Sequence, residues 1–413
     1  MNGKRIIVLG GGVGGLVAAN ELRQLLPKDH RITLIERNEV HAFAPSFLWV
    51  MTGLRQPQQI VRPTRSLLRL GIEFVPANVN AIDTNRSVVE TDGGTIGYDY
   101  LIVALGAELA PGNIPGLSEG SQTYYTLEGS SRLHTALQKF QGGSVALVVA
   151  SMPYKCPGAP LEGAMLMADF FRKTGRAPKV DLHLFTPESQ PMPVAGPALG
   201  NAATEMLSAR GISYHPLHKL TSVNPVAKQL EFEGKGSFGF DLLAAIPPHS
   251  APKVVSQSTL ANESGWISVD RGSLATKVEN IYAVGDVTAI SIPGRWKPDV
   301  PLMLPKAGVF AHVQASVVAH RITAAVTGRE SSVTFCGDGY CMLEAGEDLA
   351  GFAYGNFFAE PSPDVRLKRI GKAWHFGKVL FEKWWLEPYG IRRELYRQSI
   401  ALGSRLMGIP SNI

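Results

Sequence analysis

Three cysteines, Cys156, Cys336 and Cys341, are the side chains of this 413-residue chain best suited to redox chemistry. A cysteine reacts as its thiolate, and a free thiol with a pKa near ~8.5 is mostly protonated at neutral pH, so a reactive cysteine needs surroundings that favour the anion. The stretch "SMPYKCPGAPLEG" places Lys155 beside Cys156 and Glu162 six residues later. An inward-turned lysine could favour the thiolate, and the glutamate could act as an acid or base. Taken alone, however, a cysteine is more often a small buried apolar residue, and a glutamate there could equally cap a helix.

The stretch "TFCGDGYC" contains the other two cysteines, five residues apart. A turn through its glycines could bring them together, so a local Cys336–Cys341 disulfide is an alternative to a pairing between distant cysteines. Three cysteines are too few for a disulfide-stabilised scaffold, and no zinc-type spacing is present, so we expect no metal.

The N-terminal stretch "KRIIVLGGGVGGLVAANEL" reads as a buried strand, a glycine turn and a helix. Gly10, Gly12 and Gly15 have the Gly-x-Gly-x-x-Gly spacing, which lets a pyrophosphate approach the backbone and the helix N-terminus. The next strand, "RITLIER", ends in Glu36 and Arg37, and a carboxylate at this distance can accept a hydrogen bond from a ribose hydroxyl. These elements predict a dinucleotide site.

Two later stretches, "YDYLIVALGAEL" (98–109) and "VENIYAVGDVTAI" (278–290), are strands that run into turns of small residues. With the glycine motif they resemble, in order, the signatures of the FAD-binding family shaped like glutathione reductase. The resemblance implies bound FAD, with an aspartate beside its ribityl chain. The cofactor residues expected in these two stretches are Ala104, Gly106, Gly285 and Asp286.

This resemblance implies an α/β fold with two Rossmann-like dinucleotide-binding domains, one inserted in the other, and a C-terminal membrane-associating region. We expect the FAD domain at 1–110 and 276–325, the second domain at 111–275 and the C-terminal region at 326–413. In the second domain, "SVALVVA", "KVDLHLFTP" and "FDLLAAIPPH" predict buried strands. In the C-terminal region, "GYCMLEAGEDLAGFAYG" favours a β-hairpin over a helix.

Relatives that use NAD(P)H carry a second glycine loop where this chain has "SMPYKCPGAP". Pro153, Pro157 and Pro160 lack amide donors and fix φ, so this loop cannot approach a pyrophosphate in the same way. We therefore expect no nicotinamide donor, and a thiol near the flavin in its place.

Four stretches resemble segments of the sulfide:quinone oxidoreductases: "FAPSFLWVMTGLR", "CPGAPLEG", "YCMLEAG" and the C-terminal "GKAWHFGKVLFEKWW". The resemblance implies that sulfide attacks a disulfide or sulfur-bridged pair of Cys156 and Cys341, that FAD receives two electrons, and that a quinone takes them. It also implies that Glu162 is the acid or base, that Lys306 of "LPKAGVFAHVQA" lies by the flavin or a quinone, and that FAD is held non-covalently. Cys336 fits the family pattern less well.

The C-terminal segment 366–413 contains ten Lys or Arg and three Glu, a net charge of +7, whereas the rest of the chain is close to neutral. Phe376, Leu380 and Trp384 recur at helical spacing, and Lys372, Lys378 and Lys383 border them. This pattern is typical of a helix lying in a bilayer surface. A helix packed on the protein itself, or a dimer contact, is the alternative. Aromatic side chains upstream could line a quinone pocket: Phe352, Tyr354, Phe357 and Phe358.

No apolar run approaches the ~18 residues of a membrane-spanning helix, and the N-terminus enters a strand directly. We therefore expect a peripheral membrane protein without a transmembrane helix or signal peptide. Its partners would be sulfide, a membrane quinone and the membrane surface. Nucleic acid is not expected because the basic residues are local, and a homo-oligomer stays open. The alternatives are a flavocytochrome c-type sulfide dehydrogenase subunit, a type II NADH:quinone reductase, and a low-turnover membrane-tethered flavin sensor.

Overall fold

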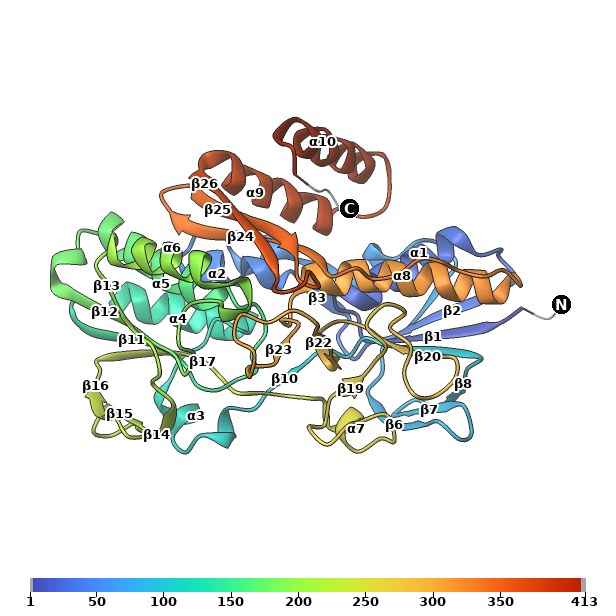
Figure 1. Cartoon of the computed structure of the whole chain (residues 1–413), viewed down its shortest axis with the longest axis horizontal. Helices are drawn as coiled ribbons and strands as arrows, with labels where there is room; N and C mark the ends of the chain where they lie inside the picture. The colour runs from blue at the N-terminus through green and yellow to red at the C-terminus, as the bar shows by residue number, and fades with distance from the viewer. Residues whose placement is uncertain (1–2, 410–413) are drawn as a thin grey trace.

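The computed structural model describes residues 3–409, which form two α/β parts side by side and a C-terminal layer across them (Figure 1). The first part is built on a five-stranded parallel sheet with the order β20-β9-β1-β2-β5. Its strands are β1 (Arg5–Leu9), β2 (Arg31–Ile35), β5 (Ile72–Val75), β9 (Tyr100–Val103) and β20 (Ile281–Ala283). Helices α1 (Val13–Leu25) and α8 (Gly308–Val326) pack together on this part.

The first sheet forms because its strands are short apolar runs that are buried on both faces, as parallel strands require. Strand β20 follows the whole second part in the chain, yet it pairs with β9 in parallel. A three-stranded antiparallel sheet covers this part: β6 (Val79–Asp83), β7 (Val88–Thr91) and β8 (Gly94–Gly97).

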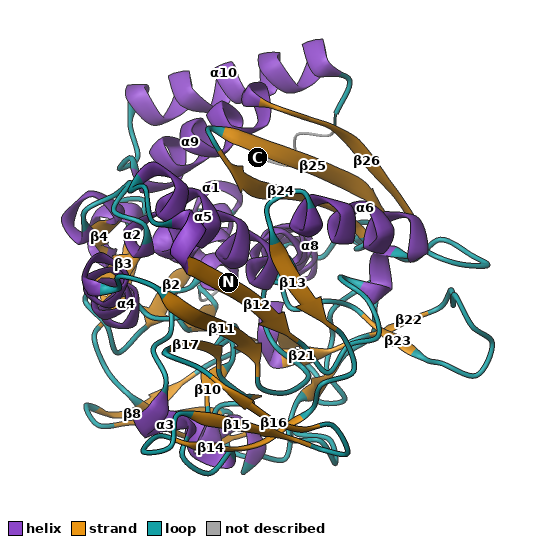
Figure 2. Ribbon diagram, turned by 90° about the vertical axis from the view of Figure 1, so that its left-hand side faces the viewer, coloured by secondary structure: helices purple, strands orange, loops and turns teal. Residues whose placement is uncertain are grey.

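The second part contains a four-stranded parallel sheet with the order β13-β12-β11-β17 (Figure 2). Its strands are β11 (Gly143–Val149), β12 (Val180–Phe185), β13 (Ile212–His215) and β17 (Leu242–Ile246), and they include the three predicted runs. Its main helices are α4 (Leu127–Lys139), α5 (Ala159–Lys173) and α6 (Pro197–Ser208). An antiparallel sheet follows: β14 (Leu220–Asn224), β15 (Gln229–Phe232) and β16 (Gly236–Gly239).

The second part ends earlier than the boundary at 275 expected from the sequence. Strand β18 (His249–Ser250) pairs with β10 (Glu108–Leu109) where the chain passes between the two parts. Beyond it, Val255, Leu260 and Trp266 belong to the hydrophobic core of the first part. Strand β19 (Ile267–Ser268) then pairs with β21 (Thr288–Ala289). Burial of these apolar side chains therefore places residues 251–275 with the first part.

The C-terminal layer begins with the predicted hairpin, which the structure confirms as β24 (Asp338–Gly346) and β25 (Leu349–Asn356). A third antiparallel strand, β26 (Asp364–Gly371), leads into α9 (Lys372–Leu386) and α10 (Ile391–Met407). Figure 1 shows α9 over the sheet and α10 outside it. Among residues 3–409, no helix has the length and apolar content needed to cross a bilayer.

Candidate functional site

The first part has a cavity of about 430 Å³ at the carboxyl ends of its central strands, the usual ligand position in such sheets. Eight of the ten predicted cofactor residues line it: Gly10, Gly12, Glu36, Arg37, Ala104, Gly106, Gly285 and Asp286. Gly15 lies behind the turn, where an added Cβ would come within 1.8 Å of the Gly10 carbonyl oxygen. Gly15 therefore permits α1 to pack against the turn, whereas an added Cβ on Gly12 would meet no atom within 4 Å.

The carboxylate of Glu36 is fixed at the end of β2. Its Oε2 accepts a hydrogen bond of 2.7 Å from the Gly11 amide, and its Oε1 accepts one of 2.7 Å from the Asn38 amide. Arg37 lies at the edge of the cavity and forms a 3.6 Å ion pair with Glu108. These contacts hold a carboxylate where a ribose hydroxyl would bind.

Asp286 provides a direct test of whether the cavity suits FAD. The amide of Gly285 donates a 2.7 Å hydrogen bond to Gln314 Oε1, which fixes the turn after β20. Asp286 Oδ1 is buried and has no hydrogen-bond partner within residues 3–409, and burial raises the pKa of this carboxyl group. An unpartnered carboxylate oxygen that faces a cavity is suited to a ligand hydroxyl. The residues present therefore fit a hydroxyl-rich dinucleotide such as FAD.

An apolar cavity of about 760 Å³ adjoins the dinucleotide cavity. Lys155 lines the dinucleotide cavity and the next residue, Cys156, lines the apolar cavity, so the two cavities are neighbours. Cys341 lines the apolar cavity as well. The structure thus brings the two predicted redox cysteines, from the turn before α5 and from β24, to one space.

The turn between β11 and α5 positions Cys156. This residue has a positive φ of 61°, and its amide donates a 2.6 Å hydrogen bond to the Lys306 carbonyl oxygen. Its own carbonyl accepts a hydrogen bond from the Ala159 amide at 2.9 Å. The left-handed backbone is costly for a residue with a Cβ and is often found at functional sites.

Cys341 is placed by strand pairing, opposite Ala353 in β25. An added Cβ on Gly158 would lie 3.4 Å from Cys341 Sγ and 4.0 Å from Glu162 Oε2, so the thiol and the carboxylate flank the same point of the backbone. Both cysteines are free thiols in the structure, and we call Cys156 and Cys341 the thiol pair. Gly158 is thus the close-approach position that lets β24 reach the start of α5.

Glu162 lies on the first turn of α5 and is only 3% exposed. Its Oε1 accepts hydrogen bonds from the Glu344 amide at 2.9 Å and from Lys378 Nζ at 2.5 Å. Lys378 belongs to α9 and is itself 8% exposed. Burial alone would lower the pKa of Lys378, but the carboxylates of Glu162 and Glu344 outweigh it and raise this pKa.

The surroundings of the thiol pair favour the protonated thiols. Burial, and then the Glu162 carboxylate, raise the pKa of Cys156 to about 12, and the same two causes raise the pKa of Cys341 further. Lys378 opposes both shifts. The site therefore stabilises a thiolate only to the extent that Lys378, and for Cys156 also the Ala159 amide, offset the desolvation and the nearby carboxylate.

Cys336 lies outside this arrangement. It is exposed and its thiol contacts the Thr334 hydroxyl and carbonyl, at 3.7 and 3.6 Å. A Cys336–Cys341 disulfide is not formed, because β24 directs Cys341 towards the apolar cavity.

The lysine beside Cys156 and the lysine expected near the flavin occupy different positions. The side chain of Lys155 lines the dinucleotide cavity, where its charge acts on Asp286. The cation that acts on both thiols is Lys378. Lys306 lines the apolar cavity, where its Nζ donates to the Asp286 and Thr288 carbonyls at 2.6 and 3.0 Å and lies 3.5 Å above the Trp266 ring. Burial lowers the pKa of Lys306 to about 8.

The structure does not bring the four aromatic residues of the expected quinone pocket together. Tyr354 and Phe357 line the same cavity as the thiol pair. Phe352 is buried and stacks on Trp374 with ring centroids 4.8 Å apart, and Phe358 packs against Phe335. Phe352 and Phe358 therefore pack against other aromatic side chains and do not line this cavity.

The basic, aromatic C-terminal segment 366–413 is only partly exposed. Trp384 and Trp385 are buried in the core of the first part, whereas Phe376 is 62% exposed, so α9 is packed on the protein along much of its length. Lys378, expected to border an exposed stripe, is buried instead. Exposed apolar side chains recur on one face of α10, and we call them the α10 stripe: Ile391, Leu395, Leu402 and Leu406.

Sequence reasoning missed Lys378 and Glu344 as members of the site. Both lie within motifs that the sequence singled out, "GKAWHFGKVLFEKWW" and "YCMLEAG". Lys378 lies four residues after Trp374 on an amphipathic helix, which predicts a position at the edge of the apolar face. Only the packing of α9 on the rest of the molecule shows that Lys378 faces Glu162.

Known proteins support this reading of the fold. The family model for pyridine nucleotide-disulphide oxidoreductases matches residues 4–319. The chain is 30% identical over 399 residues to the sulfide-quinone reductase of Aquifex aeolicus, covering 93% of this chain and 90% of that protein. It is also 30% identical to the mitochondrial sulfide:quinone oxidoreductase of Mus musculus, over 70% of this chain and 66% of that one.

A solved structure gives the same result. The crystal structure of the Aquifex aeolicus sulfide:quinone oxidoreductase superposes with a TM-score of 0.82 at 27% identity, covering 92% of this chain and 90% of that one. A type II NADH:quinone oxidoreductase of Staphylococcus haemolyticus is a further relative, 25% identical over 85% of this chain and 90% of that protein. The chain belongs to the pyridine nucleotide-disulphide oxidoreductases and, within them, to the FAD-dependent sulfide:quinone oxidoreductases.

Proposed function

We propose that this protein oxidises sulfide at the thiol pair and reduces a membrane quinone. The observation that carries the proposal is the meeting of Cys156 and Cys341 in one cavity beside the dinucleotide site. FAD, when bound, supplies a two-electron acceptor that hands the pair of electrons to the quinone.

The chain's own residues would perform the sulfur chemistry. A hydrosulfide ion attacks one sulfur of a bridged thiol pair, so that a new S–S bond forms to the incoming sulfur. The bond between the cysteines breaks, and its electron pair leaves on the other cysteine as a thiolate. A second hydrosulfide ion then attacks the outer sulfur of the persulfide; that S–S bond breaks, its electron pair stays on the cysteine as a thiolate, and the two sulfide-derived sulfur atoms depart together as the shortest polysulfide. The two cysteine thiolates re-form their bond as two electrons pass to the bound acceptor. The net change is the loss of two electrons and two protons by two molecules of hydrogen sulfide and their gain by one quinone.

We expect Glu162 to move protons in this reaction sequence. Its Oε2 and Cys341 Sγ flank the Gly158 position, and its Oε1 is held by Lys378 and by the Glu344 amide. The apolar lining of the cavity limits water, which strengthens the effect of each of these charges.

The turn before α5 argues against NADH as the electron donor. Pro153, Pro157 and Pro160 offer no amide, and the amides of Cys156 and Ala159 are already bonded to backbone carbonyls. Few amide donors remain there for a pyrophosphate. We therefore place this chain with the sulfide-oxidising relatives and not with the type II NADH:quinone oxidoreductases.

We propose further that α10 contacts the membrane surface from which quinone is drawn. Ile391 is 82% exposed and Leu406 is 80% exposed, and basic residues such as Arg392 and Arg405 flank the α10 stripe. Apolar side chains on one face, bordered by arginines, suit a helix lying in the headgroup region.

One experiment tests the activity: anaerobic addition of sulfide, and separately of NADH, to the purified yellow protein, followed by a short-chain quinone. We expect sulfide to bleach the flavin absorbance and quinone to restore it, and NADH to have little effect. Bleaching by NADH alone would contradict the proposal.

A further inference from the structure

Lys378 is a buried cation carried by the tail helix α9 into the sulfur site. Its Nζ donates to Glu162 Oε1 at 2.5 Å and lies 5.5 Å from the centroid of the Trp49 ring. The groups whose charges act on it are Glu162 of α5 and Glu344 and Cys341 of β24. Its own charge acts on Cys156 in the turn before α5, and His375 of α9 contacts the same Glu344 carboxylate.

This cation acts on both members of the thiol pair. Burial and the Glu162 carboxylate raise the pKa of each thiol, and Lys378 lowers both. Lys378 is thus placed to do what the sequence suggested for Lys155, although it comes from a distant segment of the chain, the tail helix.

We propose that Lys378 is a positioning residue of the sulfide-oxidising site, which orients Glu162 between the two cysteines and favours their thiolates. The inference rests on the proposed function for its role in turnover, but its effect on the thiols does not. Because Lys378 is on α9, the sulfur site is complete only when the tail helix is packed against α5 and β24.

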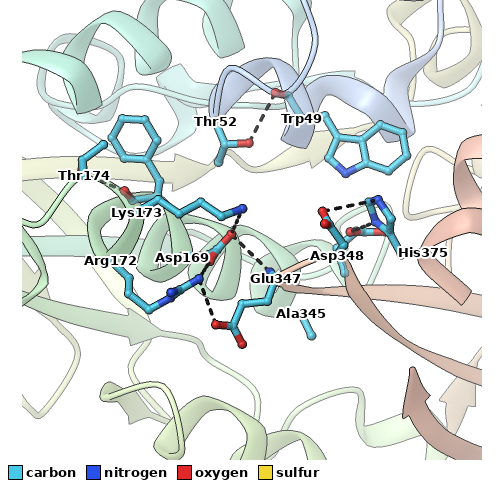
Figure 3. A network of polar contacts seen from close by, with 12 residues as sticks. Trp49, Thr52, Asp169, Arg172, Lys173, Thr174, Ala345, Glu347, Asp348 and His375 are labelled. Carbon is cyan, nitrogen blue, oxygen red and sulfur yellow. Dashed lines mark hydrogen bonds and ion pairs between the residues drawn. The ribbon is translucent and has the colours of Figure 1, made fainter. Parts of the chain in front are cut away.

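Other contacts also hold α9, so loss of Lys378 need not release the helix. His375 Nδ1 lies 2.9 Å from Glu344 Oε2. Figure 3 shows His375 facing Asp348 beside a second network, in which Asp169 binds Arg172 and Lys173. Trp384 and Trp385 add apolar burial at the other end of the helix.

Glu382, one turn after Lys378, provides a matched control. It is 5% exposed, its Oε1 accepts a 2.9 Å hydrogen bond from Arg55 Nε, and its Oε2 accepts one from the Ser46 hydroxyl. Glu382→Gln therefore removes a buried charge that holds the same helix. Glu382 is not among the causes of the shifted pKa values of the thiol pair.

The test is the alkylation rate of each cysteine in the reduced, FAD-loaded enzyme. Iodoacetamide is added and the labelled peptides are measured by mass spectrometry, with exposed Cys336 as the internal reference. A buried carboxylate that loses its cation can take up a proton as high as pH ~8–9, so the comparison is made at pH 10. The flavin spectrum and the thermal midpoint of each variant report whether the fold is kept.

We expect Lys378→Met to slow alkylation of Cys156 and Cys341 at least ~10-fold relative to Cys336, a change of about one unit in thiol pKa. Lys378→Arg should restore most of the rate, and Glu382→Gln should leave it unchanged. An unchanged rate in Lys378→Met, or an equal loss in Glu382→Gln, would overturn the inference. If sulfide fails to bleach the wild-type flavin, the proposed function fails, but the alkylation result still decides the role of Lys378.

Discussion

Replacement of Glu162 by glutamine should make the thiol pair more reactive while it slows turnover. The carboxylate and Cys341 Sγ flank the Gly158 position, and this carboxylate is the second-largest cause of the raised pKa of that thiol, after burial. Sγ and Oε2 lie 3.4 and 4.0 Å from that position, so they are at most about 7 Å apart. At that separation two unit charges interact by about 2.4 kcal/mol at an effective dielectric constant of ~20, which corresponds to ~1.7 pKa units. Glu162→Gln removes this repulsion while Lys378 stays.

The assay is alkylation of the reduced protein between pH 7 and 9, well below the pKa of either thiol. In this range the rate follows the fraction of thiolate, so ~1.7 units predict a ~50-fold faster reaction of Cys341. Cys156 should change in the same direction, since the same carboxylate raises its pKa. Exposed Cys336 should keep its wild-type rate.

Sulfide-dependent bleaching of the flavin should fall by about 10²-fold in the same variant, because a positioned acid or base typically contributes that much. The opposite signs of the two effects distinguish a proton-transfer role from simple loss of structure. Slower or unchanged alkylation of Cys341 would refute the electrostatic reasoning, and normal bleaching would refute the role of Glu162 as acid or base.

Three further predictions concern the cysteines, the cofactor and the tail. Alanine at either member of the thiol pair should abolish bleaching by sulfide, whereas Cys336→Ala should keep most of it; equal loss in all three variants would mean that the pair is wrongly chosen. Gly15→Val should yield colourless protein, since its side chain would clash with the Gly10 carbonyl, and a normal flavin spectrum after purification would contradict this. Serine at every position of the α10 stripe should reduce co-sedimentation with anionic lipid vesicles several-fold without loss of sulfide-dependent bleaching; unchanged sedimentation would remove α10 as the membrane contact.

Residues that the sequence assigned to a dinucleotide site line one cavity, because the signals that identify them are local. Gly10, Gly12 and Glu36 lie within one strand–turn–helix–strand unit, where spacing fixes the geometry. The hairpin that carries Cys341 was equally readable from alternating residues and turn-forming glycines.

The remainder of the site depends on contacts between distant segments, which spacing does not encode. Helical periodicity assigned Lys378 to the border of an exposed stripe, and Phe352 was assigned to a quinone pocket because it is aromatic. Each is buried because another element packs over it, α5 in one case and Trp374 in the other. The sequence put the domain boundary at 275 for the same reason: the core that the apolar residues after β18 join depends on long-range contacts, namely their burial against the first part and the pairing of β19 with β21.

The first and second parts of the molecule form two lobes, and helix α9 contacts both of them. The two points of contact are about two helical turns apart. Near its middle, Lys378 is bound to Glu162 of one lobe, and near its end, Trp384 and Trp385 are inserted into the other. Any rotation of one lobe against the other must therefore break a buried ion pair or expose two indole rings. We therefore expect relative motion of the lobes to be small during turnover. Proteolytic removal of the chain beyond β26 should increase that motion.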